Sequence, residues 1–309
     1  MKLDFALCVN DVYAKYISVT IKSICENHRN NPIVIHVLTD FISESNQSLL
    51  HNIVRRYDKA ELDILTVDDT ELRDLKDTWS IYTWYRVLIP ALLPDVERCL
   101  YLDADTVVTD NLSSLFALNM DDVAIACAID TEAIKEDTQK RCNFGKDDIY
   151  VCAGVMLMNL KYWRENNLSS RIIKWGREND SLIKFPDQDT INILCKNNKI
   201  VLPIKYGVQH IFYYNQTFLS TLPEELLEAY RKPAIIHYAG FAPWIRELSD
   251  TPFHHYWERY NNLLSNKVKI IYQTKGVKGM KVRIWRAMHP YALKKEMTLI
   301  EEKISLSDT

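Results

Sequence analysis

Residues 2–28 read KLDFALCVNDVYAKYISVTIKSICENH, and this stretch decides what kind of fold can follow. Its first part, from Lys2 to Val9, is rich in apolar side chains and predicts a strand. Asn10 and Asp11 then supply a turn and a helix cap. Apolar residues at helical spacing continue to about His28 (Tyr13, Ile17, Ile21 and Ile24). A strand followed at once by a helix begins a strand–helix–strand unit.

The same alternation continues along the chain and predicts an α/β fold. Strands are expected over 33–38 and 62–67, with a helix over 43–57 between them. This rhythm predicts a mostly parallel central sheet with flanking helices and right-handed crossovers. Further strands are expected at Arg98–Leu102, Val123–Ile129, Ile149–Asn159 and Ala234–Tyr238, and further helices at Ile81–Leu93, Lys161–Glu178, Asp187–Cys195 and Phe253–Leu264.

The overall composition narrows the class of protein. The chain has 309 residues, of which 47% are hydrophobic, so a full core can form. A net charge of −3 argues against nucleic-acid binding through bulk charge. Seven cysteines without a C-x-x-C pair predict free thiols in a reducing compartment. The first ten residues are too polar for a signal peptide and no long apolar run occurs, so a cytoplasmic location is expected.

Two aspartates directly follow a predicted core strand in residues 98–112, RCLYLDADTVVTDNL. The D-x-D pattern alone is weak, because the 24 aspartates of this chain produce roughly two such patterns by chance. Two occur, at Asp103/Asp105 and Asp187/Asp189. Ligands of open α/β sheets bind beyond the carboxyl ends of the strands, which favours the first pattern. Polar residues also lie at or near other predicted strand ends: Asn10, Asp11, Asp40, Asp130 and His237.

Asp103 and Asp105 predict a site for a divalent cation. Two carboxylates within about 5 Å repel each other by roughly 1 to 3 kcal/mol in a partly buried site, and a hard cation removes that repulsion. A turn after Asp103 would bring both onto one ion, and His237 is the best candidate for a third ligand, a donor set that suits Mn²⁺ or Mg²⁺. Two alternatives remain open. Asp105 could cap the following turn while Asp103 pairs with Arg86, and His237 could be a core histidine.

Phosphate binding by a glycine-rich loop is excluded, because the chain has neither a G-x-G-x-x-G nor a P-loop motif. Four other motifs occur: YLDADTVVTDNL at 101–112, AGVMLMNLKYW at 153–163, PDQDTIN at 186–192 and HYAGFAPW at 237–244. In this order and spacing they resemble the family 8 glycosyltransferases, the bacterial lipopolysaccharide galactosyl- and glucosyltransferases and their glycogenin relatives. The resemblance spans residues 3–260. It implies a GT-A fold and retaining transfer of glucose or galactose from a UDP-sugar to a glycan or lipid-linked oligosaccharide, with Mn²⁺ (or Mg²⁺) at the diphosphate.

The resemblance also implies roles for individual residues. Asp103, Asp105 and His237 are similar to the family's metal ligands. Asp187 and Gln188 resemble the pair beside the anomeric carbon. Retention then needs either a nucleophile on the far face of the sugar or attack by the acceptor on the same face; same-face attack, with the leaving phosphate as the base, is favoured. The resemblance implies further contacts: Asp130 with the sugar or acceptor, and Cys8, Val9, Asn10, Tyr13, Arg86, Ala104, Ala153 and Gly240 with the donor.

The chain departs from the family's pattern at several positions. After the first strand, Asn10 stands where the family usually has an aspartate and Val12 where it has an asparagine. Cys152 replaces the family's asparagine before Ala-Gly, and Ala242 replaces its lysine before Pro-Trp. Loss of that lysine removes a cation from the diphosphate, worth ~1 to 3 kcal/mol of charge-assisted bonding. Arg246 or a basic residue near the C-terminus is expected to substitute for it.

Other interpretations stay open at this point. Arg86 could be a surface ion-pair partner, Gln188 could cap the helix that follows it, and Trp244 is expected to pack rather than to bind. The protein could be a sugar-nucleotide binder without turnover. It could also be an inverting transferase of the same fold, with Asp130 as the base.

The last part of the chain has a different composition. Residues 1–264 are expected to form the transferase domain, and 265–309 a basic amphipathic helical segment. Residues 267–295 contain nine Lys or Arg and no acid, which leaves a net charge of −12 for the rest. Interleaved aromatic residues predict contact with an anionic membrane surface at the inner face of the plasma membrane, where a lipid-linked acceptor would lie. The alternative is a helix packed on the acidic body.

Overall fold

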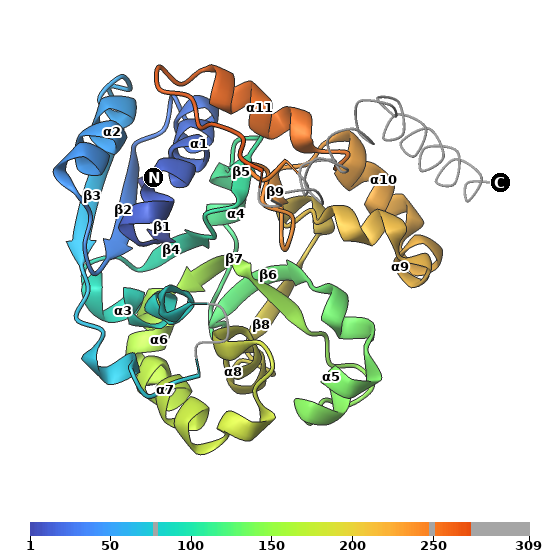
Figure 1. Ribbon diagram of the computed structural model, residues 1–309. Helices are drawn as coiled ribbons and strands as arrows, with labels where there is room; N and C mark the ends of the chain where they lie inside the picture. Colours follow the sequence, from blue (N-terminus) through green and yellow to red (C-terminus); the bar gives the residue numbers. More distant parts are fainter. Residues whose placement is uncertain (77–79, 247–250, 273–309) are drawn as a thin grey trace.

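The computed structural model describes residues 1–76, 80–246 and 251–272 (Figure 1). A seven-stranded sheet has the order β3-β2-β1-β4-β7-β6-β8, and a two-stranded sheet pairs β5 with β9. The strands are β1 Leu3–Cys8, β2 Ile33–Thr39, β3 Ala60–Thr66, β4 Arg98–Leu102, β5 Thr106–Val108, β6 Ile125–Ile129, β7 Val151–Asn159, β8 Lys199–Leu202 and β9 Ile235–His237. The helices are α1 Asp11–Asn27, α2 Glu44–Val54, α3 Ile89–Leu92, α4 Ser113–Phe116, α5 Glu136–Arg141, α6 Leu160–Glu165, α7 Leu168–Glu178, α8 Pro186–Leu194, α9 Gln216–Thr221, α10 Pro223–Arg231 and α11 His254–Asn262.

Most neighbouring strands of the large sheet are parallel, which confirms the predicted α/β class. β1 pairs in parallel with β2 and β4, β2 with β3, and β6 with β8. β7 is the exception, because it runs antiparallel to both β4 and β6. All six residues of β1 are buried, as its apolar sequence requires at the middle of a covered sheet.

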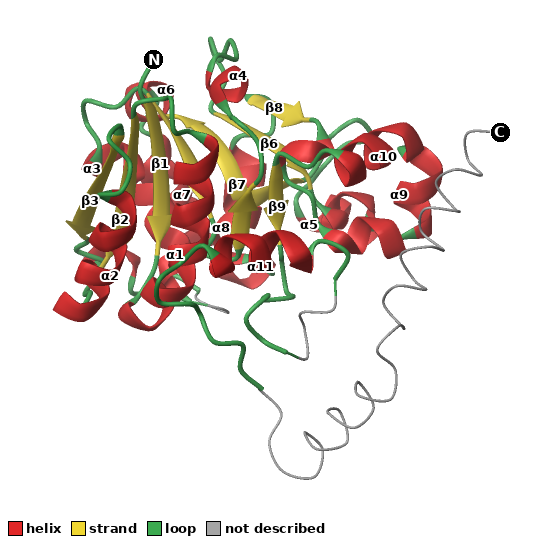
Figure 2. Ribbon diagram, turned by 90° about the horizontal axis from the view of Figure 1, so that it is seen from above, coloured by secondary structure: helices red, strands yellow, loops and turns green. Residues whose placement is uncertain are grey.

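Helices cover both faces of the sheet. Figure 1 shows α1, α2 and α11 on one side and α3, α6, α7 and α8 on the other. One core cluster joins alternate residues of β1, such as Phe5 and Leu7, to α1 and α11. A second core cluster packs Ala6 and Cys8 of β1 against the opposite helices. In Figure 2 the arrowheads of β1 and β9 point to the same edge, where the loops of the candidate site lie.

Two predicted helices differ from the structure. The helix expected over 161–178 is two helices, α6 and α7, because Asn167 between them takes a left-handed conformation with φ 50°. The helix expected over 81–93 is a 3-10 helix, Ile81–Leu88, followed by the short α3. Pro90 lies in the first turn of α3, where its missing N–H costs no hydrogen bond.

Two strands were not predicted from the sequence. β5 has only three residues, and β8 is largely half-buried or exposed, so neither has the long apolar run of a core strand. Ser43 does not cap α2 with its hydroxyl. Its N–H and Oγ instead donate to Asp11 Oδ1, both at 2.8 Å, and Asn46 Nδ2 donates to the same oxygen at 2.7 Å. Asp11 therefore links α1 to α2 and is not part of the candidate site.

The beginning of the predicted basic segment lies against the folded domain. Asn261 binds both backbone groups of Val268, at 2.8 and 3.0 Å, and Ile271 forms an isolated bridge with Ile245. Most of the segment predicted over 265–309, including the proposed membrane contact, lies outside the described residues. None of the described helices is long and apolar enough to cross a membrane. All seven cysteines are buried and free, as the sequence predicted.

Candidate active site

Asp103 stands at the end of β4, where three elements fix its position. Its N–H donates to the carbonyl of Gly154 on β7 at 2.8 Å. Its Oδ1 accepts hydrogen bonds from Tyr101 Oη at 2.7 Å and from Arg86 Nη2 at 3.0 Å. Because Oδ1 is fully used, Oδ2 is the oxygen left to face His237, at 3.5 Å.

A turn after Asp103 brings Asp105 beside β9. Thr106 Oγ1 donates to the Asp103 carbonyl at 2.8 Å and closes the turn. β5 then pairs with β9 in antiparallel register, with Thr106 opposite His237. The N–H of Tyr238 donates to the Asp105 carbonyl at 2.9 Å. The small second sheet is therefore what places a histidine from residue 237 next to two aspartates more than 130 residues earlier.

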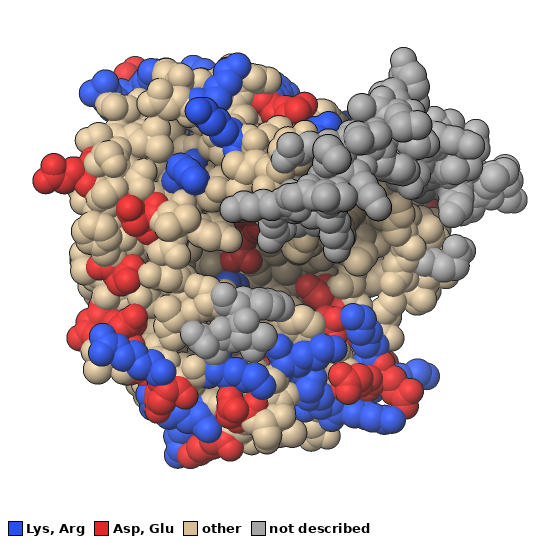
Figure 3. Space-filling model, in the orientation of Figure 1, with Lys and Arg blue, Asp and Glu red and all other residues tan. Residues whose placement is uncertain are grey.

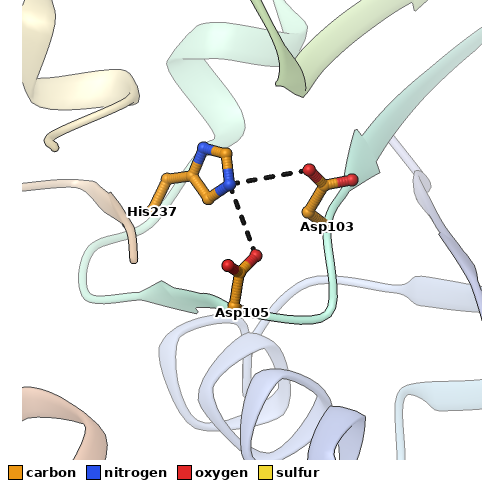
Figure 4. A group of neighbouring side chains, drawn as sticks. All are labelled: Asp103, Asp105 and His237. Carbon is orange, nitrogen blue, oxygen red and sulfur yellow. Dashed lines mark ion pairs between the residues drawn. The ribbon is translucent and has the colours of Figure 1, made fainter. Parts of the chain in front are cut away.

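The three side chains converge on one point (Figure 4). His237 Nε2 lies 3.3 Å from Asp105 Oδ1 and 3.5 Å from Asp103 Oδ2, and one ligand atom from each residue lies within 4.8 Å of the others. His237 is buried and the two aspartates are half-buried. Two carboxylates and an imidazole fit a divalent cation such as Mn²⁺ or Mg²⁺.

The protonation of the cluster follows from its charges. Burial alone lowers the pKa of His237, but Cys152 and Asp105 beside it raise that pKa well above its usual value. Burial raises the pKa of Asp103, but Arg86 and His237 lower it below its usual value. The carboxylates are thus balanced by the imidazolium and the guanidinium, and a cation would take the place of the imidazolium proton.

Gly154 of β7 leaves the space in which the cluster forms. A Cβ at this position would lie 2.3 Å from His237 Cε1 and 2.5 Å from Asp103 Oδ2, distances that real Cβ atoms do not adopt. The sequence analysis gives residues 153–163 only as a family motif and does not indicate this role of Gly154. The available signal was a glycine inside an otherwise bulky buried strand, which indicates close approach by another group.

Arg86 is buried and lies between two carboxylates, that of Asp103 in the metal cluster and that of Asp187 in α8. Its Nε, Nη1 and Nη2 donate to Thr83 O at 2.8 Å, to Ala153 O at 2.6 Å and to Asp103 Oδ1 at 3.0 Å. Nε also lies 3.0 Å from Asp187 Oδ2. The surface ion-pair interpretation of Arg86 is therefore wrong, because only 3% of this residue is exposed. The predicted pairing with Asp103 does occur, and it accompanies the metal cluster instead of replacing it.

Asp187 and Gln188 begin α8 on the other side of Arg86. Gln188 Oε1 accepts the Ala153 N–H at 2.9 Å, so its side chain is tied to β7 and does not cap the helix. Burial raises the pKa of Asp187 to about 6, although Arg86 opposes the shift. Among the described residues Oδ2 of Asp187 accepts no hydrogen bond, since the Nε–H of Arg86 is directed to Thr83.

The second D-x-D pattern has a structural role at its last residue. Asp189 is buried, and its Oδ1 accepts from Tyr150 Oη at 2.6 Å. Its Oδ2 accepts the backbone N–H groups of Lys184 and Phe185 and pairs with Arg141. These contacts hold the loop before α8, whereas both aspartates of the first pattern face His237.

Asp130 ends β6 and caps the turn that follows. Its Oδ1 accepts the N–H of Glu132 at 2.9 Å, and Gln209 Nε2 lies 3.4 Å from its Oδ2. Burial raises its pKa. The sequence did not indicate Gln209, which approaches from a segment about 80 residues later. Asp130 is not among the residues that line the cleft beside the cluster.

A cleft of about 390 Å³ opens beside the cluster. It is lined by Cys8, Val9, Asn10, Tyr13, Ser80, Tyr82, Thr83, Tyr101, Asp103, Ala104, Asp105, Ala242 and Trp244. Figure 3 shows acidic atoms in a hollow at the centre of this face. Trp244 stacks on Tyr16 with ring centroids 4.2 Å apart, so it packs as expected and also forms part of the wall. Asn10 Oδ1 accepts the N–H of Tyr13 at 2.9 Å, which leaves its amide nitrogen for a ligand.

Some expected donor contacts lie outside the lining of this cleft. They are Arg86, Ala153, His237 and Gly240. Arg86 and His237 each contact Asp103, which does line the cleft. Gly240 lies in the loop after β9, with φ 74°. Ser80, Tyr82, Thr83 and Tyr101 line it without having been predicted. A cavity of about 450 Å³ lies at the opposite ends of β1 and β4, where Lys2 and Asp4 form an ion pair at 3.5 Å.

Comparison with known proteins agrees with this architecture. The sequence profile described as glycosyl transferase family 8 matches residues 4–247. The chain belongs to this family.

Two similar proteins are named as lipopolysaccharide glycosyltransferases. A lipopolysaccharide 1,2-glucosyltransferase of Escherichia coli is 27% identical over 248 residues, which cover 76% of this chain and 71% of the relative. A lipopolysaccharide 1,3-galactosyltransferase of Salmonella typhimurium is 23% identical over 252 residues, which cover 79% and 73%. The structure of the galactosyltransferase LgtC, in complex with donor and acceptor sugar analogues, matches with a TM-score of 0.73 and 24% identity over 86% of this chain and 97% of LgtC. This match confirms the expected GT-A fold.

Proposed function

We propose that this family 8 glycosyltransferase is a retaining hexosyltransferase that uses a UDP-sugar and a divalent cation, with Mn²⁺ preferred. The observation that supports this most is the convergence of Asp103, Asp105 and His237 beside a cleft large enough for part of a nucleotide sugar. A cation bound there would neutralise the charge that develops on the leaving diphosphate. Glucose or galactose is the expected sugar, because similar proteins are named for their transfer.

The side chains around the cluster would orient the donor. Tyr13 is 43% exposed at the cleft and offers a ring face or edge to the base, with Trp244 behind it at 6.0 Å between centroids. Arg86 holds Asp103 and Asp187 in fixed positions. The carboxylate of Asp187, whose Oδ2 is buried and ion-paired with Arg86, would stabilise positive charge that develops on the sugar.

Same-face attack is the favoured route to retention. Gln188 is a poor nucleophile, and its carbonyl already accepts the Ala153 N–H. Asp187 is paired with Arg86, which reduces its nucleophilicity. With neither group suited to form a covalent intermediate, the leaving phosphate would take the proton of the acceptor hydroxyl.

The cation matters more here than in a site with a diphosphate lysine. Ala242 lines the cleft at the position of that lysine, and no Lys or Arg is among the described residues that line it. Arg246 follows in the same loop, and its N–H donates to Ile271 O at 2.8 Å at the start of the basic segment. We propose that Arg246 or a residue of that segment supplies the missing positive charge.

The acceptor we propose is a glycan or a lipid-linked oligosaccharide at the cytoplasmic face of the membrane. The similar proteins from E. coli and Salmonella are named for lipopolysaccharide. The basic residues of 267–295 would bring the cleft to an anionic surface, at roughly 1 kcal/mol for each cation near it.

The test is UDP release from a panel of UDP-hexoses, with Mn²⁺ and with EDTA. Asp105→Asn should abolish release, whereas Asp110→Asn, an exposed aspartate of the same motif, should behave as wild type. Metal-dependent release from one donor would identify the sugar. Mn²⁺-dependent UDP binding without release from any donor would favour the catalytically silent binder. An inverted anomeric configuration in the product would favour the inverting transferase instead.

A further inference from the structure

Cys152 lies against the histidine of the candidate metal site. Its Sγ is 3.4 Å from His237 Nδ1, and the two residues are only 4% and 5% exposed. The other ring nitrogen, Nε2, faces the carboxylates of Asp105 and Asp103 at 3.3 and 3.5 Å. One nitrogen of the imidazole is thus directed to the metal site and the other to a thiol.

β7 forms the surface on which this imidazole rests. Cys152 and Gly154 are two residues apart on the strand, so they face the same side. Gly154 lets the ring approach the backbone, since an added Cβ would be 3.0 Å from Nδ1 and closer still to Cε1. Between them, the N–H and carbonyl of Ala153 bind Gln188 and Arg86. A three-residue stretch of β7 therefore contacts His237, Gln188 and Arg86.

We propose that Cys152 is a positioning residue for the metal, which holds His237 by accepting the Nδ1–H hydrogen bond at its sulfur. The inference rests on the proposed metal site. An imidazole that binds a cation through Nε2 is neutral and carries its proton on Nδ1. That N–H is buried, so it needs an acceptor, and Cys152 Sγ is within reach.

A sulfur acceptor makes this support weaker than usual. Metal-binding histidines commonly donate their second N–H to a carboxylate, a carbonyl or water, which are better acceptors than a thiol. The chain has cysteine where the family's pattern has asparagine. We therefore expect the orientation of His237, and with it metal affinity, to respond to small changes at residue 152.

The experiment compares Mn²⁺ binding by the full chain and three variants, using the EPR signal of free Mn²⁺. Cys152→Ala removes the acceptor and should raise the Kd for Mn²⁺ about tenfold, the lower end of what loss of such a partner causes. Cys152→Ser restores an acceptor of similar size and should bring the Kd back to within about threefold of wild type. Cys25→Ala is the matched control, because Cys25 is equally buried but lies in α1.

A second readout separates positioning from general destabilisation. With ¹⁵N-labelled histidine and saturating Mg²⁺, the Nδ1–H proton of His237 should exchange slowly with solvent in wild type and Cys152→Ser, and faster in Cys152→Ala, where it has lost its acceptor. Wild-type Kd and wild-type proton exchange in Cys152→Ala would overturn the inference. An equal loss in Cys25→Ala would also overturn it, because the effect would then be one of stability. Absence of Mn²⁺ binding by wild type would instead refute the proposed metal site, and the inference with it.

Discussion

Replacing Gly154 with alanine should destroy the metal site while the fold survives. The added Cβ would stand 2.3 Å from His237 Cε1 and 2.5 Å from Asp103 Oδ2. Relieving these contacts requires both the ring and the carboxylate to move, by about 1 Å at most, whereas metal–ligand distances tolerate about 0.2 Å. We expect Mn²⁺ affinity to fall about 100-fold or more, since two of three ligands are displaced. The backbone itself allows alanine, because Gly154 is not at a positive φ.

The assay is a Mn²⁺ titration beside a thermal denaturation curve. Crowding a packed core costs about 1 to 3 kcal/mol, which a folded domain tolerates. Gly176→Ala is the control, since its Cβ would press on Trp84 and Leu75 at 3.0 and 3.1 Å, away from the metal site. It should lose stability and keep its Mn²⁺ affinity. Wild-type affinity in Gly154→Ala would refute the reasoning, because the three side chains could not then surround the ion as described.

Two further predictions follow from charged groups. The single amino group introduced by Arg86→Lys cannot reach Asp103, Asp187 and the backbone together. UDP release should therefore fall about 100-fold, measured as turnover, and stability by about 3 kcal/mol, measured from the melting temperature. Wild-type turnover would contradict the role of Arg86. Although burial opposes it, hydrogen bonds led by that from Tyr57 lower the pKa of Glu26 to about 2. The ionised carboxylate of Glu26 therefore contributes to the free energy of unfolding, by about 1 kcal/mol after allowance for solvent. This contribution is present above pH 4.5 and is lost as pH falls toward 2. Urea denaturation should therefore show a stability gap between wild type and Glu26→Gln that narrows over this range, and a constant gap would be the contrary result.

Local sequence patterns predicted the parts of the fold that depend on local chemistry. The unit from β1 to β3 follows from apolar runs, helical spacing and the cap at Asn10, which accepts the Tyr13 N–H as expected. The position of Asp103 and Asp105 after a buried strand predicts a metal site independently of the family resemblance. A histidine at the end of a buried strand indicates His237 as the third ligand, and β9 brings it to them.

The remaining features depend on contacts between distant segments. The pairing of β5 with β9 involves strands of three residues each, too short for any periodic signal. Gln209 meets Asp130 across 79 positions, and Arg86 meets the Ala153 carbonyl across 67. The break at Asn167 depends on a left-handed residue that the apolar spacing of 161–178 does not reveal. Such features become visible only when the chain is folded.

The most direct measurement is pulsed EPR of Mn²⁺ bound to the protein with UDP, recorded for nitrogen and phosphorus couplings. The account predicts that one ion shows both a ¹⁴N coupling, which disappears in His237→Gln, and a ³¹P coupling from the diphosphate. Phosphorus coupling without nitrogen, or nitrogen coupling that persists in His237→Gln, would contradict a cation held by His237 at the diphosphate.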